Sequence, residues 1–149
     1  MEIDLYSPER FMMEAYRQAL LANDRGEIPV GAVVVCRNRI IARAHNQVER
    51  LNDPTAHAEL LAITAAAASL GSKYLSECSL YVTLEPCLMC AGAMFWAQLG
   101  ELAFGADDPK RGYRTAGGIA LHPRTAVISG IMAVECEALL IDFFKKLRG

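Results

Sequence analysis

The sequence predicts an α/β protein with a central, mixed, five-stranded sheet and helices on both of its faces. Short apolar runs typical of strands alternate along the chain with longer segments of helical periodicity. Turn-forming Gly, Pro, Asn and Asp residues separate many of these segments. Alternating strands and helices predict that the helices pack on the sheet, because each element has to bury its apolar face. The 149 residues are expected to form one domain, covering residues 1–149.

Capping and turn residues define the first three elements. Ser7-Pro8 is typical of an N-cap followed by proline at the first helical position, and Gly26 is expected to end that helix. Residues 30–36 form a continuous run of small and β-branched residues, which is typical of a buried strand. The chain is expected to turn at residues 37–39 and to return as a second strand over residues 40–45.

The remaining elements follow the same alternation. They are a helix opening at Asp53-Pro54-Thr55 and stopping at Gly71, a strand over 80–84, a helix from Pro86 to about Gln98, a strand over 101–105, a Gly- and Arg-rich loop, a short strand over 126–129 and an amphipathic helix over 134–147. Ligands of such sheets bind at the carboxyl ends of the strands. We therefore look for functional residues just after strands and at the starts of helices.

Composition excludes several classes of protein. Hydrophobic residues make up 53% of the chain, which supports a sizeable core and argues against disorder. No apolar run approaches the roughly 20 residues of a membrane span. The stretch Met1-Glu2-Ile3-Asp4 does not resemble a signal peptide, so a cytoplasmic location is expected. The net charge is −2. Nucleic acid would therefore have to bind at a local basic patch rather than through overall charge.

Two short motifs contain the candidate metal-binding and catalytic residues of the chain. His57 and Glu59 form an H-x-E element, and Cys87 and Cys90 form a C-x-x-C element directly after Pro86. The combined pattern, H-x-E…P-C-x-x-C, is typical of zinc deaminases that act on nucleobases. The five cysteines are an odd number in a compartment expected to be reducing, so a disulfide framework is disfavoured and metal binding is favoured.

The residue types and their spacing support a catalytic zinc site. Cys87 and Cys90 are three positions apart at a helix start, which places both sulfurs on one face and near the positive end of the helix dipole. His57 supplies a third ligand, so one position remains for a water molecule whose pKa zinc lowers to about 7. Glu59 is then free to transfer protons, a contribution of about 10²–10⁴ in rate. The expected reaction is hydrolytic deamination of a heteroaromatic amidine, such as adenine, cytosine or guanine.

Other interpretations of these motifs exist. A C-x-x-C pair also occurs in redox proteins, but the sequence lacks a thioredoxin-like setting. A structural zinc site needs a fourth protein ligand, for which the chain offers His45, Cys78, His122 and Cys136. A third alternative is a zinc module that binds RNA without catalysis, which the presence of Glu59 disfavours.

Four stretches of the chain resemble the cytidine-deaminase-like superfamily and, within it, the bacterial tRNA-specific adenosine deaminases. They are residues 28–33 (IPVGAV), 52–59 (NDPTAHAE), 81–93 (YVTLEPCLMCAGA) and 104–106 (FGA). The longer phrases favour the tRNA branch over nucleoside deaminases. The resemblance implies a three-layer α/β/α sandwich, a homodimer, and conversion of adenosine to inosine at the wobble position of tRNA. A small-molecule deaminase acting on guanine or cytosine is the alternative.

The resemblance also implies roles for individual residues. It assigns zinc binding to His57, Cys87 and Cys90, and proton transfer to Glu59. Asn46 matches a position that contacts the target base, and Asp108 matches a loop acid that contacts the nucleotide sugar. From the residues alone, turn formation is the alternative explanation for Asn46 and for Asp108.

Two groups of basic residues are candidates for contact with RNA phosphates. Lys110, Arg111 and Arg114 belong to the loop after the fourth strand. Lys145, Lys146 and Arg148 end the last helix, where they also complement the helix dipole.

The helix at residues 88–99 carries no charged residue. A helix that is apolar nearly all round is usually buried on all sides. In a small domain this predicts a subunit interface and therefore a homodimer.

Overall fold

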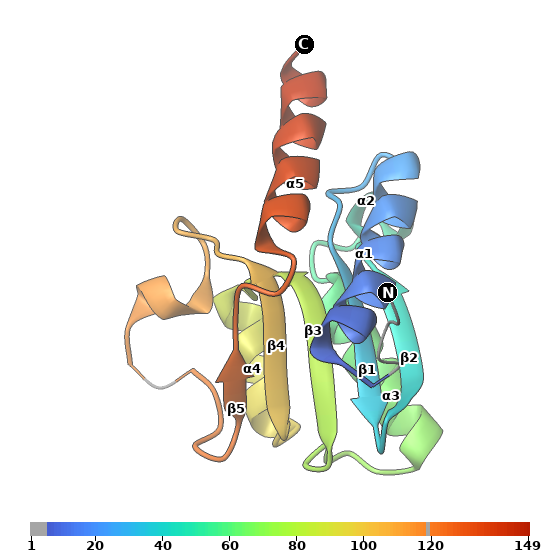
Figure 1. The fold of residues 1–149 in the computed structure, drawn as a ribbon, viewed down its shortest axis with the longest axis vertical. Helices are drawn as coiled ribbons and strands as arrows, with labels where there is room; N and C mark the ends of the chain where they lie inside the picture. The colour runs from blue at the N-terminus through green and yellow to red at the C-terminus, as the bar shows by residue number, and fades with distance from the viewer. Residues whose placement is uncertain (1–5, 119) are drawn as a thin grey trace.

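The computed structural model describes residues 6–118 and 120–149, so the acidic stretch at residues 1–4 lies outside the described residues. Its elements, shown in Figure 1, are α1 (Pro8–Asp24), β1 (Gly31–Cys36), β2 (Arg39–His45), α2 (Val48–Leu51), α3 (Ala58–Leu70), β3 (Cys78–Leu84), α4 (Leu88–Trp96), β4 (Glu101–Ala106), the 3₁₀ helix η1 (Tyr113–Ala116), β5 (Ala126–Ile128) and α5 (Ala133–Arg148). The predicted order of strands and main helices is confirmed.

The sheet has five strands in the order β2-β1-β3-β4-β5. β1 pairs antiparallel with β2 and with β3, whereas β3, β4 and β5 are parallel. The predicted mixed sheet is therefore confirmed. The parallel pair β3 and β4 requires a crossover, which α4 supplies. The two strands end side by side, where the backbone N–H of Glu85 donates to the carbonyl of Ala106 (2.8 Å).

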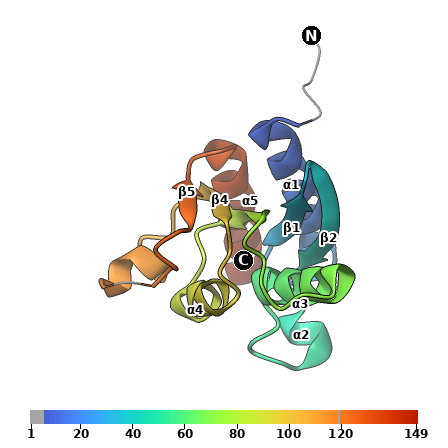
Figure 2. The same cartoon turned by 90° about the horizontal axis from the view of Figure 1, so that it is seen from below.

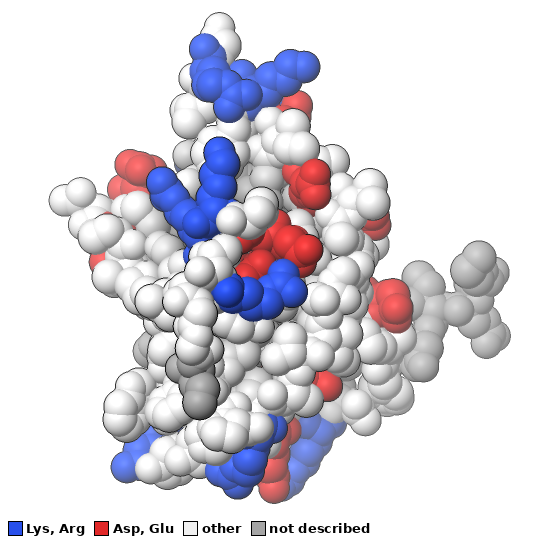
Figure 3. All heavy atoms as spheres, turned by 90° about the vertical axis from the view of Figure 1, so that its left-hand side faces the viewer, with Lys and Arg blue, Asp and Glu red and all other residues white. Residues whose placement is uncertain are grey.

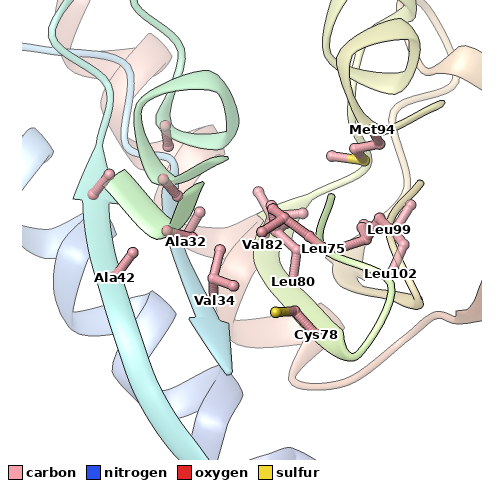
Figure 4. Packing of buried hydrophobic residues seen from close by; sticks show 14 of the residues in the cluster. Ala32, Val34, Ala42, Leu75, Cys78, Leu80, Val82, Met94, Leu99 and Leu102 are labelled. Carbon is pink, nitrogen blue, oxygen red and sulfur yellow. The ribbon is translucent and has the colours of Figure 1, made fainter. Parts of the chain in front are cut away.

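Helices cover both faces of the sheet, which gives the three layers predicted (Figure 2). α1 and the start of α5 lie on one face, while α3 and α4 lie side by side on the other. β1 has no exposed residue, and its side chains alternate between the two faces. Ala32 and Val34 join the larger apolar cluster under α3 and α4 (Figure 4), and Val33 and Val35 join the smaller one under α1.

α1 begins as the sequence predicts and packs very closely on the sheet. The Ser7 hydroxyl accepts a hydrogen bond from the Arg10 N–H (3.2 Å), so Ser7 caps the helix. At Gly31 a Cβ atom would overlap the backbone of Ala15 and Ala19. Only glycine permits this approach of helix to strand, which makes Gly31 a packing requirement rather than a turn.

The entry to α3 differs from the prediction. The helix begins at Ala58, and residues 53–55 instead form a turn in which the Asp53 carboxylate accepts from both the N–H and the hydroxyl of Thr55 (2.8 and 2.7 Å). Asp side chains that bond to the backbone in this way compete with helix formation. The short α2, which ends at Leu51 and is followed by a left-handed C-cap at Asn52, was not predicted. As a result His57, rather than Asp53, stands at the start of the helix.

None of the described helices is long and apolar enough to cross a membrane.

Candidate metal centre and active site

His57 and Cys87 are the N-cap residues of α3 and α4, the two helices that lie side by side on one face of the sheet (Figure 2). Both have extended backbone conformations, and neither side chain caps its own helix. The two side chains are therefore free to face each other. Cys90, one turn into α4, completes the group: His57 Nδ1 lies 3.7 Å from Cys87 Sγ and 3.5 Å from Cys90 Sγ, and the two sulfurs are 3.7 Å apart.

These separations fit a zinc ion. With Zn–S near 2.3 Å and Zn–N near 2.05 Å, a tetrahedron has S–S edges of about 3.8 Å and S–N edges of about 3.6 Å. The three ligand atoms thus already span one face of a tetrahedron, and one corner remains open. The group contains only His57, Cys87 and Cys90 among the described residues. None of the four candidates for a fourth ligand of a structural site, His45, Cys78, His122 and Cys136, belongs to it.

The two sulfurs differ in acidity. A hydrogen bond between the two sulfurs lowers the pKa of Cys87 to about 4, and the same contact raises the pKa of Cys90. The Cys87 thiolate in turn raises the pKa of His57. Zinc ligands bind in their deprotonated forms, so zinc binding would release the protons that remain on this group.

Glu59 is buried next to this group. It is the second residue of α3, its exposed fraction is 4%, and it does not belong to the group of ligand atoms. Burial raises the pKa of its carboxyl to about 7. A carboxyl with this pKa both accepts and donates protons near neutral pH, which is the property expected of a general acid–base group.

Asn46 has a structural role that the sequence did not reveal. Its side-chain oxygen accepts from the N–H of Ala58 (2.8 Å), and its amide nitrogen donates to the carbonyl of Ile28 (3.1 Å). Asn46 therefore fixes the first N–H of α3, directly after His57. One amide hydrogen remains for a further partner, because the NH₂ group has two.

Asp108 forms the turn that was the alternative interpretation of this residue. Its Oδ1 atom accepts from the N–H groups of Lys110 (3.2 Å) and Arg111 (3.0 Å). The turn exposes the side chains of Lys110 and Arg111, which form no ion pair with any described residue. The second carboxylate oxygen of Asp108 takes no part in the turn.

Arg114, which the sequence grouped with these two residues, is engaged within the protein. Its guanidinium pairs with Glu85 (2.9 Å) and Asp107 (2.8 Å). Figure 3 shows the face that carries this loop: basic side chains lie in separate groups, with acidic side chains beside the central one. In α5, Lys146 pairs with Asp142 one turn earlier (3.1 Å).

Glu85 is the residue that sequence reasoning missed. It is 3% exposed and accepts hydrogen bonds from the backbone of the loop after β4. A signal was present in the sequence: a carboxylate at the end of an apolar strand, directly before Pro86-Cys87, is buried only when it is paired.

Comparison with known proteins agrees with this geometry. The family described as the cytidine and deoxycytidylate deaminase zinc-binding region matches residues 5–106. The fold and the three-ligand centre thus define a zinc-dependent deaminase, and the cofactor expected from the sequence, zinc, fits both the family and the donor set.

A narrower family follows from the relatives. A tRNA-specific adenosine deaminase of Aquifex aeolicus (strain VF5) is 44% identical over 145 residues, covering 94% of this chain and 95% of the relative. The chain belongs to the family of tRNA-specific adenosine deaminases. A structure from a study of A-to-I editing by tRNA:A34 deaminases superposes with a TM-score of 0.81 at 41% identity, covering 87% of this chain and 98% of that one.

The fold is also shared with a small-molecule enzyme. A guanine deaminase from Nitrosomonas europaea superposes with a TM-score of 0.79 at 26% identity, covering 92% of this chain and 84% of that one. The similar TM-scores mean that the fold alone does not separate the two substrate classes. A guanine deaminase from Bacillus subtilis reaches 42% identity, but it covers 68% of this chain and 65% of its own. The tRNA-specific relatives keep 43–44% identity over 94% of this chain, which favours the tRNA enzymes.

Proposed function

We propose that this protein is a cytosolic, zinc-dependent hydrolase that converts adenosine to inosine at the wobble position of tRNA. The convergence of His57, Cys87 and Cys90 beside the buried Glu59 is the observation that carries the proposal. The identity to tRNA-specific adenosine deaminases over nearly the whole chain supports the choice of substrate.

In this reaction C6 of adenine gains the oxygen of a water molecule and releases its amino group as ammonia. His57, Cys87 and Cys90 would hold the zinc ion, which when bound supplies an activated water at neutral pH. Glu59 receives a proton from that water. It delivers this proton to the ring nitrogen N1. It then takes the second proton from the hydroxyl group formed at C6 and delivers it to the departing amine, so the proton balance closes without an external acid.

The substrate would enter as a single-stranded loop. Sequence-specific RNA recognition targets unstacked bases, and an enzyme acting on a base takes it out of the stack. We expect the remaining amide hydrogen of Asn46 to contact the base, and the carboxylate oxygen of Asp108 that takes no part in the turn to contact the sugar. The unpaired cations of Lys110 and Arg111 would meet phosphates of the anticodon loop.

Parallel assays test this proposal. The purified enzyme is incubated with an anticodon stem-loop containing adenosine at the wobble position, and separately with free guanine, cytosine and adenosine. Mass spectrometry measures inosine, xanthine and uracil. We expect turnover of the stem-loop alone. Efficient turnover of free guanine or cytosine, with none of the stem-loop, would establish the small-molecule alternative.

We also propose that the protein works as a homodimer formed through α4. Cys90, Ala91 and Met94 bury one side of this helix against the sheet, but Leu88, Met89 and Trp96 are exposed in the single chain by 54%, 40% and 79%. Large apolar side chains exposed together mark an interaction surface. The sheet and neighbouring helices therefore do not cover α4 alone, and a second copy of the chain is the partner that the resemblance implies.

A further inference from the structure

Glu85 is a buried carboxylate that the proposed reaction does not use. It stands where β3 and β4 end together, immediately before the segment that carries Cys87. The loop from residue 107 to residue 116, which carries Asp108, starts beside it because β4 ends at Ala106. Glu85 therefore lies between the metal-binding half of the site and the half expected to contact the nucleotide.

The carboxylate of Glu85 holds this loop by three hydrogen bonds. It accepts from the N–H of Asp108 (3.0 Å), from the N–H of Arg114 (3.2 Å) and from the guanidinium of Arg114 (2.9 Å). Two of these bonds end on Oε1 and one ends on Oε2, so both carboxylate oxygens are engaged by the loop.

Arg114 is itself fixed. Its guanidinium also pairs with Asp107 (2.8 Å) and lies over the ring of Phe104, 5.0 Å from the centroid. Phe104 belongs to β4 and is fully buried, so the arginine is anchored to the rigid sheet. A planar cation that stacks on a ring and bonds two carboxylates is a geometry that lysine does not reproduce.

The loop also contacts the metal-ligand segment directly. The N–H of Tyr113 donates to the carbonyl of Pro86 (2.8 Å), and Gly112 pairs with Cys87 in a β-bridge. A Cβ atom at Gly112 would overlap the carboxylate of Glu85. The loop thus closes around Glu85 and lies against the backbone of a zinc ligand.

We infer that Glu85, held by Arg114, is a positioning residue that sets the loop of residues 107–116 against Pro86-Cys87. It thereby fixes where Asp108, Lys110 and Arg111 stand relative to the metal ligands. The inference rests on the function proposed above. Displacement of a substrate-positioning segment by about 1 Å costs as much as 10²-fold in rate, which sets the scale of the effect.

The experiment compares Glu85→Gln, Arg114→Gln and the double variant. We expect Glu85→Gln to keep its zinc and its fold while kcat/KM for the anticodon stem-loop falls by about 10- to 100-fold. Its salt dependence should become shallower, because Lys110 and Arg111 are no longer aligned with phosphates. The double variant should be no worse than Glu85→Gln alone, since residues that act through one contact are not additive.

The matched control is Glu77→Gln, because Glu77 also pairs with an arginine, Arg37, at the opposite end of the sheet (3.2 Å). This control should keep the wild-type kcat/KM and salt slope. If Glu85→Gln fails to fold, the same kcat/KM and salt slope are measured on Arg114→Gln, because Arg114 is half-exposed and its substitution disturbs the core less. A folded, zinc-loaded Glu85→Gln with wild-type kcat/KM and salt slope overturns the inference, and so does loss of zinc from that variant.

Hydrogen exchange separates this inference from the proposed function. The N–H groups of Asp108 and Arg114 should be protected in the wild-type protein and should exchange faster in Glu85→Gln. Absence of stem-loop turnover in the wild-type enzyme would refute the proposed function alone. Unchanged exchange at these two amides would refute the positioning role alone.

Discussion

The Nδ1 atom of His57 lies 3.7 Å from the Sγ atom of Cys87, although the two residues are thirty positions apart in the chain. Each residue is the N-cap of its helix, and neither side chain forms a capping hydrogen bond. The metal centre is thus built where two helix N-termini meet, and their dipoles favour the thiolate forms of the ligands.

Removing one ligand should remove the metal. In Cys87→Ala the sulfur that ionises first is lost, and two protein ligands remain. We expect the zinc content, measured by plasma mass spectrometry, to fall from one ion per chain to near zero, with a lower melting temperature because metal binding stabilises the folded state. Cys36→Ala, at a buried thiol outside the metal group, should keep its zinc. Zinc retention by Cys87→Ala would contradict the assignment.

Glu59→Gln should separate metal binding from catalysis. The amide keeps the size of the side chain but does not transfer protons, so turnover of the stem-loop should fall by about 10²–10⁴-fold. The zinc content should stay at the wild-type value because Glu59 does not belong to the ligand group. Glu9→Gln, at an exposed position of α1, is the control. An active Glu59→Gln enzyme would rule out the proton-transfer role.

Acid should weaken the charged cluster in which Glu14 of α1 pairs with arginines of α1 and β2. Burial alone would raise the pKa of Glu14, but the hydrogen bond from Arg43 and the charges of Arg10, Arg17 and Arg43 hold it below its usual value of 4.5. The pKa of Glu14 is lower in the folded than in the unfolded protein, so the ionised carboxylate stabilises the fold fully above the unfolded-state pKa. This stabilisation is lost as pH falls through the folded-state pKa.

The corresponding measurement is the free energy of unfolding of Glu14→Gln and of the wild type at several pH values. At neutral pH the variant should be less stable by about 1.5–3 kcal/mol, the usual size for a hydrogen bond to a charged group. The difference should be constant above pH 4.5 and shrink below it. A difference that grows on acidification would contradict the cluster's role. Glu137→Gln, exposed on α5, provides the baseline.

The single tryptophan of the chain reports on the proposed dimer. Trp96 is 79% exposed in the isolated chain, so its emission in a monomer should be that of an indole in water. Association through α4 would bury the ring and shift the emission to shorter wavelength as the protein concentration rises. Sedimentation velocity should show a dimer for the wild type and a monomer for Trp96→Glu. Water-like emission and monomeric sedimentation of the wild type at micromolar concentration would refute the dimer.

The salt dependence of stem-loop binding should show whether Lys110 and Arg111 contact phosphates. Binding of a single strand that neutralises Z phosphates weakens with salt with a slope of about −0.7Z. The double substitution Lys110→Gln and Arg111→Gln should therefore reduce the slope of log affinity for the stem-loop by about 1.4. Lys73→Gln, in the exposed turn after α3, should leave it unchanged. An unchanged slope in the double variant would place the phosphate contacts elsewhere.

The sequence by itself determined the features that depend on neighbouring residues. Helical periodicity and the Ser7-Pro8 cap located α1, the β-branched run located β1, and the three-residue spacing put Cys87 and Cys90 on one helix face. These features are encoded within one or two turns of chain, where propensity and capping act directly. The late start of α3 was missed because the Asp53 side chain competes with the helix locally.

Only the tertiary structure decided which distant groups meet. The sheet order brings the end of β3 beside the end of β4, which pairs Arg114 with Glu85 rather than leaving it for RNA. The same packing turns Asn46 toward the first N–H of α3. Such contacts join positions 12 to 30 residues apart, and their energy depends on strand order and burial rather than on local sequence.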